Sequence, residues 1–360
     1  MTRAACLRLA MAAIALAAAA MTSFPATAEP KLSDTKTLTR IAFGSCVDQK
    51  KPQPIWQAIR GYRPDLFLFM GDNVYGSIRS RQETDLSRLR EAYATARQVE
   101  PFQSLRDAVP TMAVWDDHDF GLNDGGGTFK HKAEAQKLFA DFWDLPADDP
   151  RRQRKGIYHA RIVGPDGRRV QIILLDTRYF RSDLKRTDKR GAPGRERYLQ
   201  DPDPAKTILG DTQWRWLEEQ LKQPAEIRLI VSSIQVIADG HGWERWGNLP
   251  AERRRLYDLI ARSGAKGVIF LSGDRHVGAL YNVQPAGMKY SLREITASSL
   301  NRPYPNAKER GPHRLGNIYG HENFGTIDID WEARRVQIDL RDIDGAVVRT
   351  LSVPMTSLGY

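Results

Sequence analysis

The amino-acid sequence predicts an α/β fold, because short apolar runs and amphipathic helical segments alternate along most of the chain. The apolar runs are continuous and rich in β-branched and aromatic residues, which is typical of strands covered on both faces. After residue 291 the pattern changes to alternating apolar and polar residues, as in antiparallel strands with one exposed face. Strands that alternate with helices predict a layered α/β core with mixed sheets.

Six apolar runs are each followed directly by glycine or polar residues. These runs are Leu38–Phe43, Asp65–Met70, Thr111–Trp115, Val170–Leu175, Ile227–Val231 and Gly267–Leu271. Ligands of open α/β sheets bind beyond the carboxyl ends of the strands. We therefore expect the polar residues that follow these runs to meet at one sheet edge and to form the functional site.

Helices are expected between the apolar runs, and further strands after them. The predicted helices are Leu86–Val99, Lys132–Phe142, Asp211–Leu221 and Glu252–Ala261. In the third helix, Trp214, Leu217 and Leu221 fall on one face, and Asp211 is expected at the N-cap. The predicted late strands are Phe324–Trp331, Arg335–Arg341 and Val347–Val353. Turn residues separate these late strands, which we expect to close a second, antiparallel sheet.

The N-terminal segment has the pattern of a secretory leader. Arg3 and Arg8 precede an apolar run over Leu9–Met21, and Ala26-Thr27-Ala28 matches a small-residue cleavage site. The run is shorter than the roughly 20 apolar residues that a transmembrane helix needs. The expected parts are a signal peptide over 1–28, an N-terminal extension over 29–37 and one domain over 38–360. We expect a periplasmic or secreted protein that is not an integral membrane protein after cleavage.

The charge and the cysteine content limit the possible functions. The formal net charge is +10, or +8 without Arg3 and Arg8, so a diffuse positive field would favour anionic substrates. The alternative is a non-catalytic exported module that binds polyanions, although no specific nucleic-acid or protein partner is predicted. Cys46 is the only cysteine after the leader. In an oxidising compartment such a residue is a buried apolar side chain, a reactive thiol or a metal ligand.

Several residues after the strands are candidate metal ligands. Asp72 can bridge two cations through its two oxygens, and Tyr75 is either a phenolate ligand or a packed loop aromatic. The segment Asp116–Asp119 gathers three carboxylates around an imidazole, and these would repel each other unless cations neutralise them. Asp274 and His276 are two positions apart, so both face the same way in an extended segment. This pattern predicts a two-metal site.

Six motifs in this order resemble the alkaline phosphatase D family of metallophosphoesterases, which is similar in site layout to purple acid phosphatases. The motifs are Phe43–Cys46, Gly71–Gly76, Trp115–Gly121, Leu175–Arg178, Leu209–Leu217 and Ser272–His276. The resemblance implies a metallophosphoesterase-like four-layer α/β/β/α sandwich with mixed sheets. It also implies a cluster of Fe(III) and Ca(II), with other divalent ions as alternatives.

By this resemblance, each metal has an expected set of ligands. The iron ligands would be Cys46, Asp72, Tyr75 and His276, and the ligands of the second ion would be Asp72, Asp117 and Asp274. Asp116 remains the alternative to Asp117, because the register of the Asp-Asp-His motif leaves either residue open.

The resemblance implies an exported phosphoesterase that hydrolyses phosphate esters through a metal-bound hydroxide. Phosphomonoesters and phosphodiesters both suit such a cluster, and a phospholipase D-like activity is an alternative. His118 would stabilise the developing charge or protonate the leaving group. Arg178 is a candidate phosphate clamp, with a salt bridge to Asp176 or another buried carboxylate as the alternative.

One long loop offers a further candidate for substrate binding. Purple acid phosphatases use an additional histidine after a strand, and here either Gln235 or His241 is expected to take that place. His241 is therefore a candidate substrate-binding residue. Trp243 and Trp246 follow on the same loop. They would form either a wall that selects the leaving group or a structural anchor under the loop.

Overall fold

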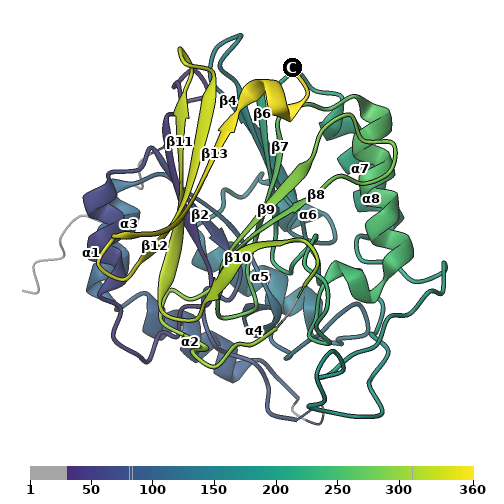
Figure 1. The fold of residues 1–360 in the computed structure, drawn as a ribbon. Helices are drawn as coiled ribbons and strands as arrows, with labels where there is room; N and C mark the ends of the chain where they lie inside the picture. The colour runs from purple at the N-terminus through teal and green to yellow at the C-terminus, as the bar shows by residue number, and fades with distance from the viewer. Residues whose placement is uncertain (1–30, 81, 83, 310) are drawn as a thin grey trace, which may run out of the picture.

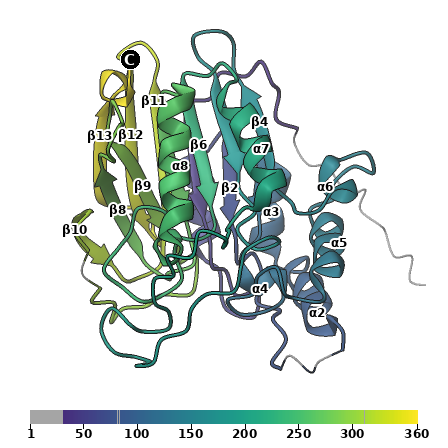
Figure 2. The ribbon, with the colours of Figure 1, turned by 90° about the vertical axis from the view of Figure 1, so that its right-hand side faces the viewer.

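The structure is a computed structural model, which describes residues 31–80, 82, 84–309 and 311–360. The expected signal peptide over 1–28 lies outside the described residues. Two mixed sheets pack against each other, and helices cover their outer sides (Figures 1 and 2). This arrangement confirms the expected α/β/β/α sandwich. In the described ranges, no helix combines the length and the apolar character that crossing a bilayer requires.

The first sheet has the strand order β13-β12-β11-β1-β2-β3. Its strands are β1 (Arg40–Gly44), β2 (Leu66–Met70), β3 (Thr111–Val114), β11 (Asn323–Asp330), β12 (Arg335–Asp342) and β13 (Val347–Pro354). The first three are parallel, and β11 joins β1 in antiparallel register with Ile41 opposite Ile327. The late strands therefore extend the sheet of β1, which corrects the expectation that they close the other sheet.

The second sheet has the strand order β10-β8-β9-β7-β6-β5-β4. Its strands are β4 (His159–Val163), β5 (Val170–Leu174), β6 (Ile227–Ser232), β7 (Val268–Ser272), β8 (Gly278–Val283), β9 (Leu292–Ala297) and β10 (Arg314–Tyr319). Neighbouring strands are parallel from β5 through β6 and β7 to β9. The expected single sheet edge is thus divided between two sheets.

The helices form the outer layers. They are α1 (Ile55–Tyr62), α2 (Ser87–Ala96), α3 (Glu100–Ala108), α4 (Asp117–Phe120), α5 (Lys132–Phe142), α6 (Pro150–Gln153), α7 (Gly210–Leu221) and α8 (Pro250–Ser263), with short 3₁₀ turns at Trp246–Asn248 and Met355–Leu358. Figure 1 shows α1 and α3 outside the first sheet and α7 and α8 outside the second. Asp211 is not the N-cap of α7, because the helix begins at Gly210 and Leu209 precedes it.

Two apolar cores explain why the central strands are continuous apolar runs. Along β6, Leu229 and Val231 belong to the larger core, which includes residues of both sheets, whereas Ile230 packs in the core under α7 and α8. Alternate side chains thus enter different cores, and neither face of the strand meets water. Burial on both faces selects apolar residues at most positions, with Arg228 as the exception inside β6. The polar residues of the site begin where the strand ends.

Candidate metal centre

The candidate site lies where strand ends from both sheets meet. Cys46 follows β1, Asp72 follows β2, and Asp117 follows β3 as the first residue of α4. Asp274 and His276 follow β7 of the second sheet. Segments that are more than 200 positions apart along the chain therefore contribute to one cluster. For example, the Tyr75 hydroxyl lies 2.9 Å from Nε2 of His276.

Three groups of side chains have potential ligand atoms within 4.8 Å of one another. The groups are Cys46, Asp72 and His276; Asp72, Asp117 and His118; and Asp116, Asp117 and Asp274. Asp72 and Asp117 each belong to two groups, as expected of carboxylates that lie between two cations. The structure thus brings together all six residues expected as ligands, with Tyr75 joined through its contact to His276.

The backbone at these positions is locally strained. Cys46, Asp72, Asp274 and His276 have φ angles of 63°, 50°, 67° and 56°, in the left-handed region that residues other than glycine rarely adopt. Each strand must turn sharply at its end to point the side chain into the cluster. Strain of this kind costs on the order of 1–3 kcal/mol per residue and is concentrated at functional sites.

Burial and mutual repulsion oppose ionisation of most acids in the cluster. Burial, and then the neighbouring carboxylate of Asp117, raise the pKa of Asp72 well above its usual value. Burial and Asp116 likewise raise the pKa of Asp274. The pKa of the Cys46 thiol is raised by burial and by Asp72. These groups bind metals in their ionised forms, and a multivalent cation among them would oppose all three shifts.

Asp117 behaves in the opposite way. Burial again opposes ionisation, but nearby His118 and Arg178 and the backbone N–H of Asp124 outweigh it and lower the pKa of Asp117. The Asp124 N–H donates to Oδ2 of Asp117 at 2.6 Å. The other oxygen, Oδ1, is buried and has no hydrogen-bond partner among the described residues. An ionised carboxylate with one free buried oxygen is suited to bind a cation.

The set of donors fits two different cations. A thiolate, an imidazole and a phenolic oxygen around Asp72 suit a transition metal such as iron. Carboxylate oxygens from Asp72, Asp117 and Asp274 suit a hard ion such as calcium. Oδ2 of Asp116 is also buried without a hydrogen-bond partner in the described part of the chain. These orphaned oxygens are the observation that best matches a bound metal pair.

Asp119 holds the two acidic loops in place. Its carboxylate accepts hydrogen bonds from the backbone N–H groups of Asp72 (3.2 Å), Asn73 (3.2 Å) and Asp116 (2.6 Å). The Asn73 amide donates both to Asp119 (2.5 Å) and to the carbonyl of Val114 at the end of β3 (2.9 Å). The sequence motif contained Asp119, but only the fold reveals that it supports the loops and does not face the cluster.

A cavity of about 260 Å³ opens over the cluster. It is lined by Asp72, Asp117, His118, Asn123, Asp124, Arg197, Trp243, Glu244, Asp274, Arg275, His276 and Tyr304. The Ser77 hydroxyl lies 2.9 Å from Nδ1 of His118 and holds the imidazole at the cavity wall. The sequence analysis did not select Asn123, Asp124, Arg197, Glu244, Arg275 and Tyr304. Arg275 lies between Asp274 and His276 in a motif that the sequence did show, whereas the other five come from loops without a spacing signal.

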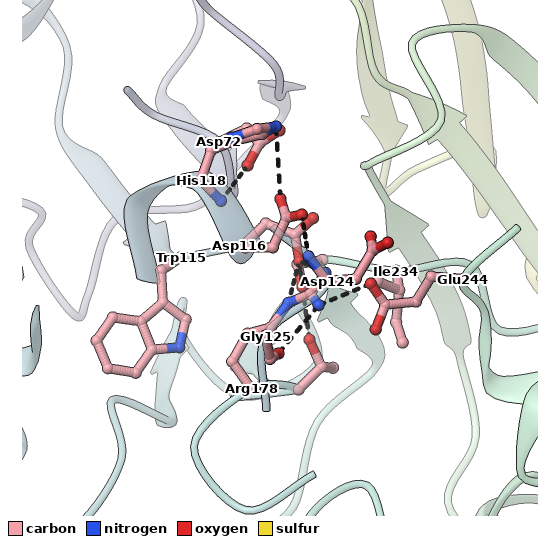
Figure 3. Close-up of polar contacts among 12 residues, drawn as sticks. Asp72, Trp115, Asp116, His118, Asp124, Gly125, Arg178, Ile234 and Glu244 are labelled. Atoms are coloured by element: carbon pink, nitrogen blue, oxygen red, sulfur yellow. Dashed lines mark hydrogen bonds and ion pairs between the residues drawn. The ribbon is translucent and has the colours of Figure 1, made fainter. Parts of the chain in front are cut away.

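Arg178 does not serve as the expected phosphate clamp. Its side chain is fully buried, and its guanidinium bonds to Oδ1 of Asp116 at 2.5 Å and to Oε2 of Glu244 at 2.7 Å. Figure 3 shows the Arg178 side chain pointing toward Asp116 and Glu244. Both ends of the guanidinium are thus occupied by carboxylates. The buried salt bridge, which was the alternative, describes this arginine.

The position of Arg178 also bears on the choice between the two adjacent acids. Oδ1 of Asp116 receives both the Arg178 guanidinium and the Ser233 hydroxyl, the latter at 2.5 Å. Asp116 does not line the cavity, whereas Asp117 does. This geometry makes Oδ1 of Asp116 the counter-ion of Arg178. Its Oδ2 has no hydrogen-bond partner among the described residues, and Asp116 remains with Asp117 and Asp274 in one group of potential ligands.

His241 and Gln235 lie beside the site rather than in it. Nε2 of His241 is 3.0 Å from the Gln235 side-chain oxygen, and its Nδ1 accepts the backbone N–H of Trp243 at 3.2 Å. Burial, and then nearby Arg275, lower the pKa of His241 well below its usual value. Neither residue lines the cavity, so the expected role of His241 in substrate binding is not met. His241 instead orders the loop that carries Trp243.

The two loop tryptophans have different environments. Trp246 is fully buried, and its indole N–H donates to Ser232 at 3.0 Å, which makes it the structural anchor. Trp243 lines the cavity, where the guanidinium groups of Arg197 and Arg275 lie 5.1 and 4.8 Å from its ring centre. Trp246 is thus the structural anchor, and Trp243 forms part of the cavity wall.

Comparison with known proteins gives a consistent picture. Alkaline phosphatase D of Bacillus subtilis (strain 168) is 23% identical over 287 residues, which cover 68% of this chain and 46% of that protein. The chain therefore spans about half the length of this curated relative. The solved structure of PhoD is similar with a TM-score of 0.68 and 17% identity, covering 91% of this chain and 70% of that chain.

A second solved structure shares the fold at lower similarity. GAP50, the anchor in the inner membrane complex of Plasmodium, matches with a TM-score of 0.54 and 12% identity, over 89% of each chain. At such identities these structures support the fold alone. The family is shown by the sequence model of PhoD-like phosphatases, which matches residues 41–340. That match spans most of the chain, so the chain belongs to the PhoD-like phosphatase family.

Proposed function

We propose that this protein is an exported, metal-dependent hydrolase of phosphate esters. Membership of the PhoD-like phosphatase family supports a phosphatase. The observation that carries the proposal is the position of Asp72, whose side chain belongs both to the group with Cys46 and His276 and to the group with Asp117 and His118. The leader pattern over 1–28 supports export to a periplasm or to the medium.

The proposed metals are Fe(III) and Ca(II). Cys46, Asp72, Tyr75 and His276 would hold the iron, and Asp72, Asp117 and Asp274 would hold the calcium. When bound, the two cations would polarise the phosphoryl oxygens and activate the attacking water. The chain's own contribution would be an open cavity in which the ester is oriented toward both ions.

His118 is the proposed catalytic residue. Its imidazole lines the cavity, and the Ser77 hydroxyl at Nδ1 fixes the ring, so that Nε2 can face the substrate. From that position it would stabilise the charge on the phosphoryl group or protonate the leaving oxygen. Arg275 also lines the cavity, and its Nη2 pairs with Glu309. We propose that its other N–H groups contact the phosphate oxygens, in place of Arg178.

Phosphomonoesters and phosphodiesters are both within the proposal. An aryl phosphate and a bis(aryl) phosphate with the same leaving group, compared at matched pH, separate the two activities. A preference for the monoester would identify a phosphatase in the narrow sense. A preference for the bis-ester would identify a phosphodiesterase, the activity class to which a phospholipase D-like enzyme also belongs.

The decisive test is the substitution Asp72→Asn. The amide keeps an oxygen that can accept the backbone N–H of His118, now bonded to Oδ1 at 3.1 Å, but it removes the charge shared by the two ions. We expect loss of most bound metal, measured by elemental analysis, and a fall in kcat/KM of about a thousandfold or more. Asp166→Asn, at a side chain that is 96% exposed, is the matched control and should change neither quantity. Retained activity in Asp72→Asn would rule out this function.

A further inference from the structure

A second pocket adjoins the cavity of the candidate metal centre. It has a volume of about 410 Å³ and is lined by Asn123, Asp124, Arg186, Thr187, Arg190, Arg197 and Tyr198. We call it the arginine pocket. Asn123, Asp124 and Arg197 also line the metal-site cavity, so the two hollows share a wall. A molecule whose phosphate lies at the metal centre can therefore extend into the arginine pocket.

The arginine pocket carries positive charge that the protein leaves unpaired. Its one acid, Asp124, is already engaged, because Oδ2 receives Nη1 of Arg197 at 2.6 Å and the Tyr198 hydroxyl at 2.7 Å. Arg186 and Arg190 are exposed, and within the described ranges no carboxylate lies within 4.0 Å of either guanidinium. Two guanidinium groups at the rim are thus available to an anion.

The loop that carries these arginines is held by backbone hydrogen bonds. The N–H of Thr187 donates to the carbonyl of Arg197 at 2.9 Å, and Arg186 pairs with Tyr198 in an antiparallel bridge. The N–H groups of Arg197 and Tyr198 both donate to the carbonyl of Gly242, at 3.0 and 2.7 Å. Gly242 precedes Trp243, which lines the metal-site cavity. The pocket is therefore anchored to the wall of the catalytic cavity.

We propose that the arginine pocket is a second anion-binding subsite, and that the preferred substrates are phosphate esters whose leaving group carries a further phosphate. The inference rests on the proposed function, because the first phosphate must lie at the metal centre. Arginine binds phosphate oxygens in a planar, bidentate fashion, so Arg186 and Arg190 suit this ligand. Binding of the second phosphate, which does not react, also helps to orient the reacting phosphate at the metal centre.

The test uses a pair of defined compounds at each of several spacings. These are α,ω-alkanediol bisphosphates with two to six carbons and the alkyl monophosphates of equal chain length, assayed with the metal-loaded protein at low ionic strength. We expect the wild type to favour the bisphosphate in kcat/KM by about tenfold at one or more spacings, beyond the twofold gain from having two scissile groups. Added salt should reduce this preference.

The double variant Arg186→Gln/Arg190→Gln should bring the preference down to about the statistical twofold. Arg254→Gln/Arg262→Gln, at two exposed arginines on α8, is the charge-matched control and should keep the wild-type preference. A wild type that cleaves monophosphates but shows no preference at any spacing would overturn the subsite alone. A double variant in which kcat/KM falls by the same factor for both compounds would also overturn the subsite. That result would show that the two arginines only attract anions to the protein. If the wild type cleaves a bis(aryl) phosphate but neither of these monoesters, the inference fails alone. If it cleaves none of the three compounds, the proposed function fails and the inference fails with it.

Discussion

Asp72 has the contacts that a bridging ligand needs. Its Oδ2 lies 3.7 Å from Sγ of Cys46, while its Oδ1 accepts the backbone N–H of His118 at 3.1 Å. The two oxygens thus face different parts of the cluster. The left-handed φ of 50° at Asp72 sets this orientation, and the carboxylate of Asp119 holds the backbone there. The orientation of the Asp72 carboxylate is therefore a property of the main chain as much as of the side chain.

His118 provides the test at the level of a single residue. It could serve as a third ligand near Asp72 and Asp117 or act on the substrate. We expect His118→Ala to lower kcat by about 10²–10⁴-fold, the usual contribution of a proton-transferring group, and to retain the bound metal. Elemental analysis and steady-state kinetics on the same preparation measure both effects. Loss of one metal equivalent in this variant would instead make His118 a ligand.

At the level of elements, the strands that end in ligands were predictable because burial on both faces leaves an unbroken apolar run. Such runs located β1, β2, β3 and β7 to within a few residues, and with them the positions of Cys46, Asp72, Asp117 and Asp274. The family resemblance supplied the assignment of these residues to one cluster. The segments β4, β8, β9 and β10 were not predicted, since their burial is incomplete or their sequences lack a clear period.

Other features depend on contacts that no local pattern encodes. The division of the parallel strands between two sheets follows from how β11 pairs with β1, some 280 positions away. The role of Arg178 depends on Glu244, which reaches it from a distant loop. A motif can identify an arginine after a strand. Whether that arginine binds substrate or a buried acid depends on the side chains that the fold places around it. Sequence reasoning therefore located the site better than it assigned the roles within it.

The turn after β2 provides a test of how an element positions a ligand. Gly71 has a φ of 104°, and a Cβ there would lie 2.5 Å from Cβ and 2.8 Å from the backbone nitrogen of Asp116. We expect Gly71→Ala to lower the free energy of unfolding by about 2–4 kcal/mol and to displace Asp72, with a fall in metal content. Urea denaturation of protein that has been treated with a chelator measures the change in the free energy of unfolding separately from the change in metal content.

The matched control for this turn is Gly167→Ala. Gly167 has a φ of 83° but no atom within 4 Å of the added Cβ, so it should show only the backbone penalty of about 1 kcal/mol. Equal destabilisation by the two substitutions would mean that the contact with Asp116 has no role in setting the turn.

At the scale of the whole molecule, the candidate centre exists only while the two sheets are packed together. The first sheet contributes Cys46, and the segment after β9 of the second sheet contributes Ser298, whose hydroxyl lies 3.2 Å from Sγ of Cys46. Backbone bonds from Leu300 to Ser45 (3.0 Å) and from Asn301 to Cys46 (3.3 Å) join the same two segments. Metal binding should therefore stabilise the packing of the sheets, and hence the fold.

This coupling predicts that the stabilisation by metal grows with pH. In the metal-free protein, burial and neighbouring carboxylates hold the pKa values of Asp72 and Asp274 above their usual range, so the folded state binds more protons than the unfolded state. The stability from these protonated acids is present below pH 4 and is lost as the pH rises through the raised pKa values. The pKa of Asp117 is lowered, so this residue changes the pH dependence of stability only below about pH 4. It does not alter the loss of stability above pH 5. Bound cations hold Asp72 and Asp274 in their ionised form, so their contribution to the loss of stability with rising pH disappears.

We therefore expect chelator-treated protein to show a Tm that falls from pH 5 to pH 8, and the Tm of the metal-loaded protein to fall less. The difference between the two should be several degrees larger at pH 8, as measured by thermal unfolding followed by circular dichroism. Asp72→Asn should have a shallower slope than the wild type after chelation, because one of the acids is gone, whereas Asp166→Asn should keep the wild-type slope. A difference that is independent of pH would show that the carboxylates are not gathered around cations, since the repulsion between these acids is what the cations are expected to relieve.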